Sequence, residues 1–300
     1  MTKREKMENE FREIFGTLMS GERSEFKQAK KRIDRLWHAD TETFQKAAPL
    51  VLEYIPRFEE VKMPENQAAF VSGLNLFYLS LGDDHFETLK NFTLKLLQHP
   101  HGHVREAMRH TADWLHMSLS SRLRPFVYPA GKPLTDEQKR CMAEAEKQYA
   151  GLLKELEALL DKYDQEDDDS EYIDEMKPSI SKSLNQFWGQ ITRGRMYREF
   201  LEKTTPIPTE VYVRRKEIEQ ELADMLRKTK SDFDVDDIRD VIFNEDGSSD
   251  LQDIISMFDR GGDVSELSDI LEIVTDAWNY FPHRSLDGLS PTEKALQARA

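Results

Sequence analysis

The chain has 300 residues, a third of them charged, and a formal net charge of −15. Hydrophobic residues make up 38% of the chain and include 16 Phe and 9 Tyr. They can build a substantial core, which argues against a disordered protein. Gly and Pro are sparse, and the alternation of Val, Ile and Thr that is typical of strands is almost absent. The composition therefore predicts an all-α protein.

Cysteine content and hydropathy bear on the compartment. The single cysteine, Cys141, excludes an intrachain disulfide and suits a reducing environment. The N-terminal stretch MTKREKMENEFREIF lacks the apolar core of a signal peptide. No window approaches the roughly 18 apolar residues that a membrane-spanning helix needs. We therefore expect a cytoplasmic protein that makes no contact with a membrane.

Helical periodicity runs through most of the chain. Capping boxes at Thr135–Gln138 and Ser290–Glu293 mark two helix starts. The predicted helices cover roughly 2–19, 22–38, 41–57, 65–81, 84–98, 102–122, 135–163, 170–192, 194–203, 209–229, 235–244, 248–259, 264–281 and 291–299.

The stretch HPHGHVREAMRHTADWL (99–115) holds four of the eight histidines of the chain. On a helix, His103, Glu106 and His110 lie one turn apart on one face, as ligands of a metal ion would. One helix rarely supplies all the ligands of one ion, because successive turns are about 5.4 Å apart. We therefore expect exposed or turn histidines and no bound metal, and keep the metal site as the weaker alternative.

The segment 86–115 resembles a HEAT repeat, in which a helix ending in Leu-Leu is followed by a short turn and a second helix. The resemblance is weakest at the turn, where such repeats usually have Asp and this chain has His99 and His101. It implies a right-handed α-α superhelix of antiparallel helix pairs, with Ala107 in the contact between two helices. The residues that match the repeat pattern are Val104, Arg105, Ala107 and Leu115.

The acidic stretch DQEDDDSE (164–171) is the predicted boundary between domains. Such a concentration of charge does not pack into a core, so we expect an exposed linker or loop there. It would separate a HEAT-like region, 1–163, from a second all-α region with a C-terminal cap, 172–300. One continuous superhelix, with 164–171 as a surface loop, remains the alternative.

Basic and aromatic residues alternate in FWGQITRGRMYREF (187–200), a pattern that also suits a nucleic-acid surface. Alkylpurine DNA glycosylases, which are HEAT-like, bind DNA with a basic concave face. The net charge of −15 disfavours such a partner for this chain. The candidate phosphate-binding residues are Arg193, Arg195, Arg198, Arg214 and Arg215.

The acidic excess of the C-terminal third lies mainly in 231–276, which holds fifteen acidic and two basic residues. Within it, DFDVDDIRDVIF (232–243) begins like a calcium-binding loop. The loop fails because Asp237 stands where Gly is required and Phe243 where a bidentate Glu is required. We expect a solvated helix surface there.

The segment WNYFPHRSLDGLSPTEKA (278–295) resembles the tail motif of integrase-type transposases over fewer than twenty residues. Nothing upstream resembles their nuclease core. We expect Trp278, Tyr280 and Phe281 to be buried, a tight turn at Asp287–Gly288, and a terminal helix that closes the fold. A recognition tail is the competing hypothesis. The matching residues are Pro282, His283, Arg284, Leu286, Gly288, Pro291 and Glu293.

These patterns favour a non-catalytic scaffold that binds a protein or peptide, with no cofactor. The second hypothesis is a nucleic-acid-associated protein or DNA-repair enzyme that uses the 187–216 region. The third is a metal-dependent enzyme centred on His103 and His110. An enzyme therefore ranks behind a binding protein.

Overall fold

A computed structural model describes residues 1–20, 23–81, 83–123, 134–165, 179–193, 195–245, 250–258 and 264–298. Within these ranges the chain is helical and has no strand, which confirms the all-α prediction. No helix in the described ranges is long and apolar enough to cross a membrane. The chain forms two compact units, an N-terminal unit (Met1–Ile191) and a C-terminal unit (Thr192–Ala300).

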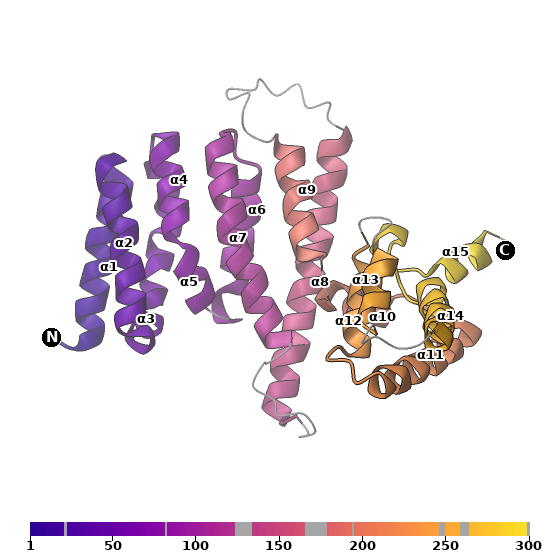
Figure 1. Cartoon of the computed structure of the whole chain (residues 1–300). Coiled ribbons are helices and arrows are strands. Elements are labelled where there is room, and N and C mark those ends of the chain that lie inside the picture. Colours follow the sequence, from indigo (N-terminus) through magenta and orange to yellow (C-terminus); the bar gives the residue numbers. More distant parts are fainter. Residues whose placement is uncertain are drawn as a thin grey trace. The chain divides into compact units, whose positions relative to one another are not determined.

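The helices of the N-terminal unit lie side by side, with neighbours in the chain close in space (Figure 1). Its α-helices are α1 (Lys3–Ser20), α2 (Arg23–Ala39), α3 (Thr41–Ala47), α4 (Pro64–Gly73), α5 (Asn75–Ser80), α6 (Phe86–Leu97), α7 (Gly102–Leu123), α8 (Asp136–Gln165) and α9 (Ile180–Ile191). Short 3₁₀ helices are η1 (Ala48–Glu53), η2 (Ile55–Glu60) and η3 (Asp83–His85).

The boundary between the units follows α9 instead of coinciding with the acidic stretch 164–171, most of which lies outside the described residues. Helix α9 belongs to the N-terminal unit because it packs on α7 and α8. In addition, the Tyr149 hydroxyl on α8 donates a 2.5 Å hydrogen bond to the carbonyl of Ile191. The boundary between the two units is therefore set by the packing of α9 and not by the local charge density.

Two predicted helices are interrupted in the structure. The segment 41–57 becomes α3 followed by η1 and η2, because Pro49 and Pro56 cannot donate the backbone hydrogen bonds of a continuous α-helix. The segment 65–81 breaks into α4 and α5 just after Gly73. A Cβ atom on Gly73 would lie 2.8 Å from the Leu18 side chain, so this glycine lets α4 approach α1 closely.

The α6–α7 segment, which resembles a HEAT repeat, packs its two helices against each other across a short turn. The Arg105 guanidinium donates to the carbonyl of Pro100 at 3.0 Å and closes this turn. Met108 and Ala112 are fully buried, whereas Ala107 is only partly buried. At about 100° per residue Ala107 lies at the edge of the buried arc, so its burial is partial, and its place in the contact between the two helices stays a prediction.

The C-terminal unit is a smaller helical bundle (Figure 1). Its helices are α10 (Arg195–Thr204), α11 (Thr209–Lys228), α12 (Val235–Phe243), α13 (Asp250–Ser256), α14 (Val264–Tyr280), the 3₁₀ helix η4 (Arg284–Leu286) and α15 (Pro291–Gln297). Its core is formed by Ile218, Leu222, Leu226, Ile238, Ile242, Ile254, Phe258, Ile270, Ile273, Val274, Ala277 and Phe281.

The end of α14 and the segment after it pack onto this core. Phe281 is 1% exposed, and Trp278 and Tyr280 are partly buried against the core, so the prediction holds fully for Phe281 and in part for the other two. The capping box at the start of α15 is confirmed, since Ser290 and Glu293 each bond the other's backbone amide.

The predicted tight turn is also present. Asp287 and Gly288 both have positive φ angles, 58° and 79°. A Cβ atom on Gly288 would come within 2.5 Å of the Leu201 side chain on α10. Glycine is therefore required here both by the backbone conformation and by the close approach of α10.

Candidate protein-interaction face

On the histidine-containing face of α7, Glu106 is in contact with two neighbouring side chains. Glu106 lies 3.0 Å from Arg109 and 3.0 Å from the His110 Nε2 atom. The hydrogen bond from Arg109 is the main cause that lowers the pKa of the Glu106 carboxyl. His103 and His110 are exposed. Among the described side chains, no group of three His, Cys, Asp or Glu residues is arranged to hold a metal ion.

His99 has a structural environment in the turn before α7. Its ring lies edge-on to Phe58, with 5.9 Å between centroids, and its Nδ1 atom accepts the backbone N–H of His101 at 3.2 Å. Burial, and secondarily the nearby His101, lower the pKa of His99 to about 4. His99 is therefore neutral near pH 7 and helps to shape the turn.

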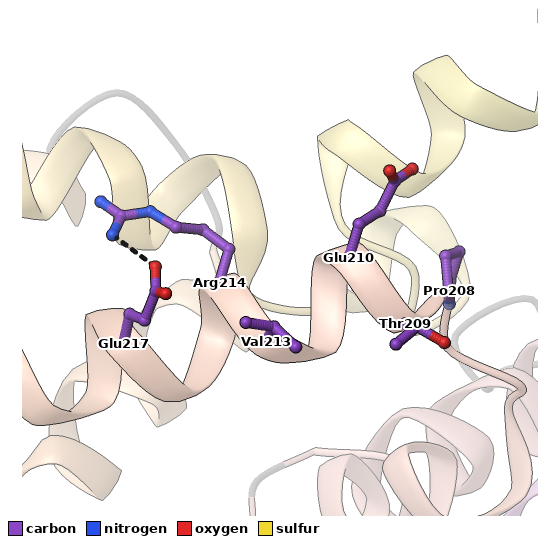
Figure 2. Close-up of a pocket in the computed structure, with 6 residues that line it drawn as sticks. All are labelled: Pro208, Thr209, Glu210, Val213, Arg214 and Glu217. Carbon is purple, nitrogen blue, oxygen red and sulfur yellow. Dashed lines mark hydrogen bonds and ion pairs between the residues drawn. The ribbon is translucent and has the colours of Figure 1, made fainter.

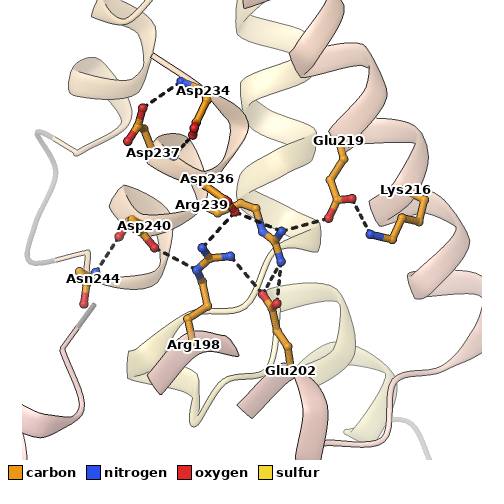
Figure 3. A network of polar contacts seen from close by, with 10 residues as sticks. All are labelled: Arg198, Glu202, Lys216, Glu219, Asp234, Asp236, Asp237, Arg239, Asp240 and Asn244. Atoms are coloured by element: carbon orange, nitrogen blue, oxygen red, sulfur yellow. Dashed lines mark hydrogen bonds and ion pairs between the residues drawn. The ribbon is translucent and has the colours of Figure 1, made fainter. Parts of the chain in front are cut away.

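Arg198, a candidate phosphate ligand, is fully buried on α10. Its guanidinium donates to Asp240 at 3.0 Å and to Asp236 at 3.2 Å, and it lies 3.5 Å from Glu202 (Figure 3). Burial lowers the pKa of this guanidinium, followed by repulsion from Arg239, while the carboxylates oppose the shift. Its partners are acids of the chain itself.

Arg239 extends the same network (Figure 3). It bonds Glu202 at 2.6 Å, lies 3.4 Å from Glu219, and stacks its guanidinium over the Phe281 ring at 5.7 Å. The network thereby joins α10, α11 and α12. The sequence did not indicate it, because the contacts that join the three helices connect residues far apart along the chain.

The aspartates of the stretch 232–243, which begins like a calcium-binding loop, have partners within the protein. Asp234 caps α12, and its carboxylate accepts the backbone N–H of Asp237 at 2.9 Å. Asp237 in turn accepts the N–H of Asp234 at 2.8 Å. The carboxylates of Asp234 and Asp237 therefore cap the N-terminus of α12. Those of Asp236 and Asp240 neutralise Arg198.

Arg215, the second buried candidate, bonds the Glu293 carboxylate and the carbonyl of Tyr280. Both side chains of this ion pair are buried, with relative exposures of 8% and 3%. Arg215 therefore ties α11 to the end of α14 and to α15. It is part of the packing of the C-terminal segment.

Arg214 contacts three carboxylates, Glu217 at 3.1 Å, Glu221 at 3.0 Å and Asp276 at 2.5 Å. These hydrogen bonds, that of Asp276 foremost, raise the pKa of its guanidinium. Figure 2 shows an open depression along the first turns of α11, where Arg214 is directed to Glu217. The depression is lined by Pro208, Thr209, Glu210, Val213, Arg214 and Glu217.

The five candidate arginines therefore do not act as one phosphate site. Arg198, Arg214 and Arg215 are each paired with carboxylates of the C-terminal unit. Arg193 is exposed, and the side chain of Arg195 lies outside those that the structure describes. Spacing along the sequence could not distinguish these roles, because each of the three paired arginines has at least one partner acid on another helix.

Helix α14 presents an exposed face that the sequence did not single out. Leu267 and Leu271 are 45% and 41% exposed and lie one helical turn apart. The opposite face contributes Ile270, Val274 and Ala277 to the core. A signal was present in the sequence, since these two leucines fall outside the stripe of core residues. The exposed residues of this face are Leu267, Ser268, Asp269, Leu271, Glu272 and Thr275.

A groove between α11 and α14 adjoins this face, with a volume of about 430 Å³. Met225 and Ile273 contribute apolar surface to it. The Arg214–Asp276 ion pair joins its two walls. Its lining residues are Arg214, Glu221, Asp224, Met225, Lys228, Asp269, Glu272, Ile273 and Asp276. Five carboxylates against two cations make the groove electronegative.

Together, the groove and the exposed face form a surface of mixed apolar and acidic character. The chain matches none of the protein-family models, curated proteins or solved structures with which it was compared.

Proposed function

We propose that this chain is a non-catalytic helical protein that binds another polypeptide, and that the exposed face of α14 is a binding surface. The observation that carries the proposal is the exposure of Leu267 and Leu271 one turn apart on a helix whose other face lies in the core. Covering them would contribute about 1 kcal/mol per leucine from apolar burial. A partner would also extend contact into the adjoining groove.

The stacked helices of the N-terminal unit also support a scaffold role. Its stacked helices and the α6–α7 pair closed by Arg105 are consistent with a HEAT-like superhelix. Stacked helical repeats create extended surfaces for partners. We place the protein in the cytoplasm on the basis of its single cysteine.

The two other functions have less support. A nucleic-acid role would need exposed cations, whereas Arg198 and Arg215 are buried and paired with acids. A metal site on α7 would need a free carboxylate beside the histidines, whereas Glu106 is held by Arg109 and His110.

Site-specific cross-linking tests the proposal. A photoreactive amino acid at Thr275, on the exposed face of α14, should yield polypeptide adducts in cells, to be identified by mass spectrometry. The matched control position is Gln220, which is also exposed but lies on α11 outside the groove lining. The Thr275 adducts should disappear when Leu267 and Leu271 are both replaced by Ser. Identical adducts from Thr275 and Gln220, or none from Thr275, would refute this assignment.

A further inference from the structure

We propose that the segment bound on α14 is a basic amphipathic helix, an inference that rests on the proposed binding role of this face. Its apolar side chains would cover Leu267 and Leu271, and its Lys or Arg side chains would pair with Asp269 and Glu272. The exposure of the leucines, the arrangement of the face and the charge of α14 each support this partner chemistry.

The arrangement of the exposed face suits a facing helix. At about 100° per residue, Ser268 and Thr275 fall along its midline, seven residues apart. Leu267 and Leu271 lie on one flank, and Glu272 lies on the other. Small side chains on the midline let a second helix approach to the usual 8–10 Å between axes. A helix lying there would meet apolar contacts on one side and carboxylates on the other.

The charge of α14 favours a basic partner. Helix α14 carries four acidic residues and no Lys or Arg. Asp276 is neutralised by Arg214 at 2.5 Å. Among the described residues, no cation lies within ion-pair distance of Asp269 or Glu272, and both side chains are exposed. The charge that remains to be matched by a partner is therefore negative, and it is located beside the leucines.

The same charges disfavour a second copy of the chain as the partner. A symmetric dimer through α14 would place the same surface of two copies together. Asp269 and Glu272 of one copy would then face a surface with the same carboxylates and no compensating cation on α14. Like charges brought together in this way are unfavourable. A partner helix with basic side chains on its flank would instead be attracted to Asp269 and Glu272.

A helical partner also fits the spacing better than an extended one does. Leu267 and Leu271 are four residues apart, about 6 Å along the axis, which matches apolar residues at i and i+4 of a facing helix. A segment in extended β-conformation binds chiefly through the backbone of an open strand edge. The C-terminal unit has no strand among its described residues.

Two synthetic peptides test the proposal on the full chain. Both are amphipathic 18-residue helices with the same leucine face, and they differ in carrying Lys or Glu on the flanks. Fluorescence anisotropy should show binding of the Lys peptide and at least tenfold weaker binding of the Glu peptide. The affinity for the Lys peptide should fall further as salt is raised, because the contacts involve exposed charges.

Three variants localise the effect. Asp269→Asn with Glu272→Gln should weaken binding of the Lys peptide roughly tenfold, since two exposed ion pairs are lost. The control Asp136→Asn with Glu137→Gln makes the same change of net charge on exposed residues of α8 and should leave the affinity unchanged. Leu267→Ser with Leu271→Ser should weaken binding roughly 30-fold, since about 1 kcal/mol of apolar burial is lost per leucine. All six positions are exposed, so thermal melts should match the parent chain.

The outcomes distinguish this inference from the binding role on which it rests. Equal binding of the two peptides, or an unchanged affinity in the Asp269/Glu272 variant, overturns the basic partner even if the Thr275 cross-links persist. A parent chain that sediments as a dimer and becomes monomeric in the Leu267/Leu271 variant identifies a second copy as the occupant and also overturns it. Loss of the Thr275 cross-links as well would remove the binding role.

Discussion

Replacing Glu293 by Gln should loosen the C-terminal segment from the core of its unit. Gln retains an oxygen that can accept the backbone N–H of Ser290, which Glu293 now accepts at 2.7 Å. It lacks the charge that compensates Arg215, and the side chains of this ion pair are only 8% and 3% exposed. The guanidinium would keep the carbonyl of Tyr280 as an acceptor. Removing one partner of a buried ion pair costs about 3–5 kcal/mol.

Hydrogen exchange followed by mass spectrometry measures this loss locally, which suits a chain of two units. A loss of about 3 kcal/mol should accelerate exchange of amides in 280–297 by roughly 100-fold. The control Glu217→Gln removes a carboxylate whose side chain is 54% exposed and should cost under about 0.5 kcal/mol. If both variants exchange at the same rate, Arg215 does not hold the segment, and the hypothesis of a recognition tail regains support.

In urea denaturation, Ala112→Asp should lower the free energy of unfolding by several kcal/mol, because it buries an unpaired charge. Ala107→Asp should lower it much less, because Ala107 is partly exposed. Equal losses would contradict the observed orientation of α7. Gly288→Ala should lower the free energy of unfolding by more than about 1 kcal/mol, since φ is 79° and the new Cβ atom would clash with Leu201. An unchanged melting temperature would contradict the observed turn at Asp287–Gly288. In the folded protein the pKa of His99 is about 4, below its ordinary value of 6.5. Between pH 6.5 and pH 4 the unfolded state therefore binds more protons than the folded state does, and the free energy of unfolding falls as the pH is lowered through this range. Discounted for partial exposure, this loss should be about 1–2 kcal/mol and absent from His99→Asn; the same pH profile in both proteins would rule out the effect.

Much of the helical structure could be predicted from the sequence because it depends on nearby residues. The capping box at Ser290 and Glu293 and the turn at Asp287–Gly288 are contacts within a few positions, and both are present in the structure. The all-α class follows from periodicity in the same way. Where the prediction of helices was wrong, as in the interruption after α3, the local cause is proline.

The candidate site depended on contacts that no local pattern contains. Arg193 and Arg198 belong to one basic run, yet the first is exposed and the second is fully buried against Asp236 and Asp240. The difference arises because α12, some forty residues later, packs beside α10. The exposure of Leu267 was likewise decided by which side of α14 the other helices of its unit cover. Sequence alone determined where the helices form, and tertiary packing determined which charges and apolar side chains remain for a partner.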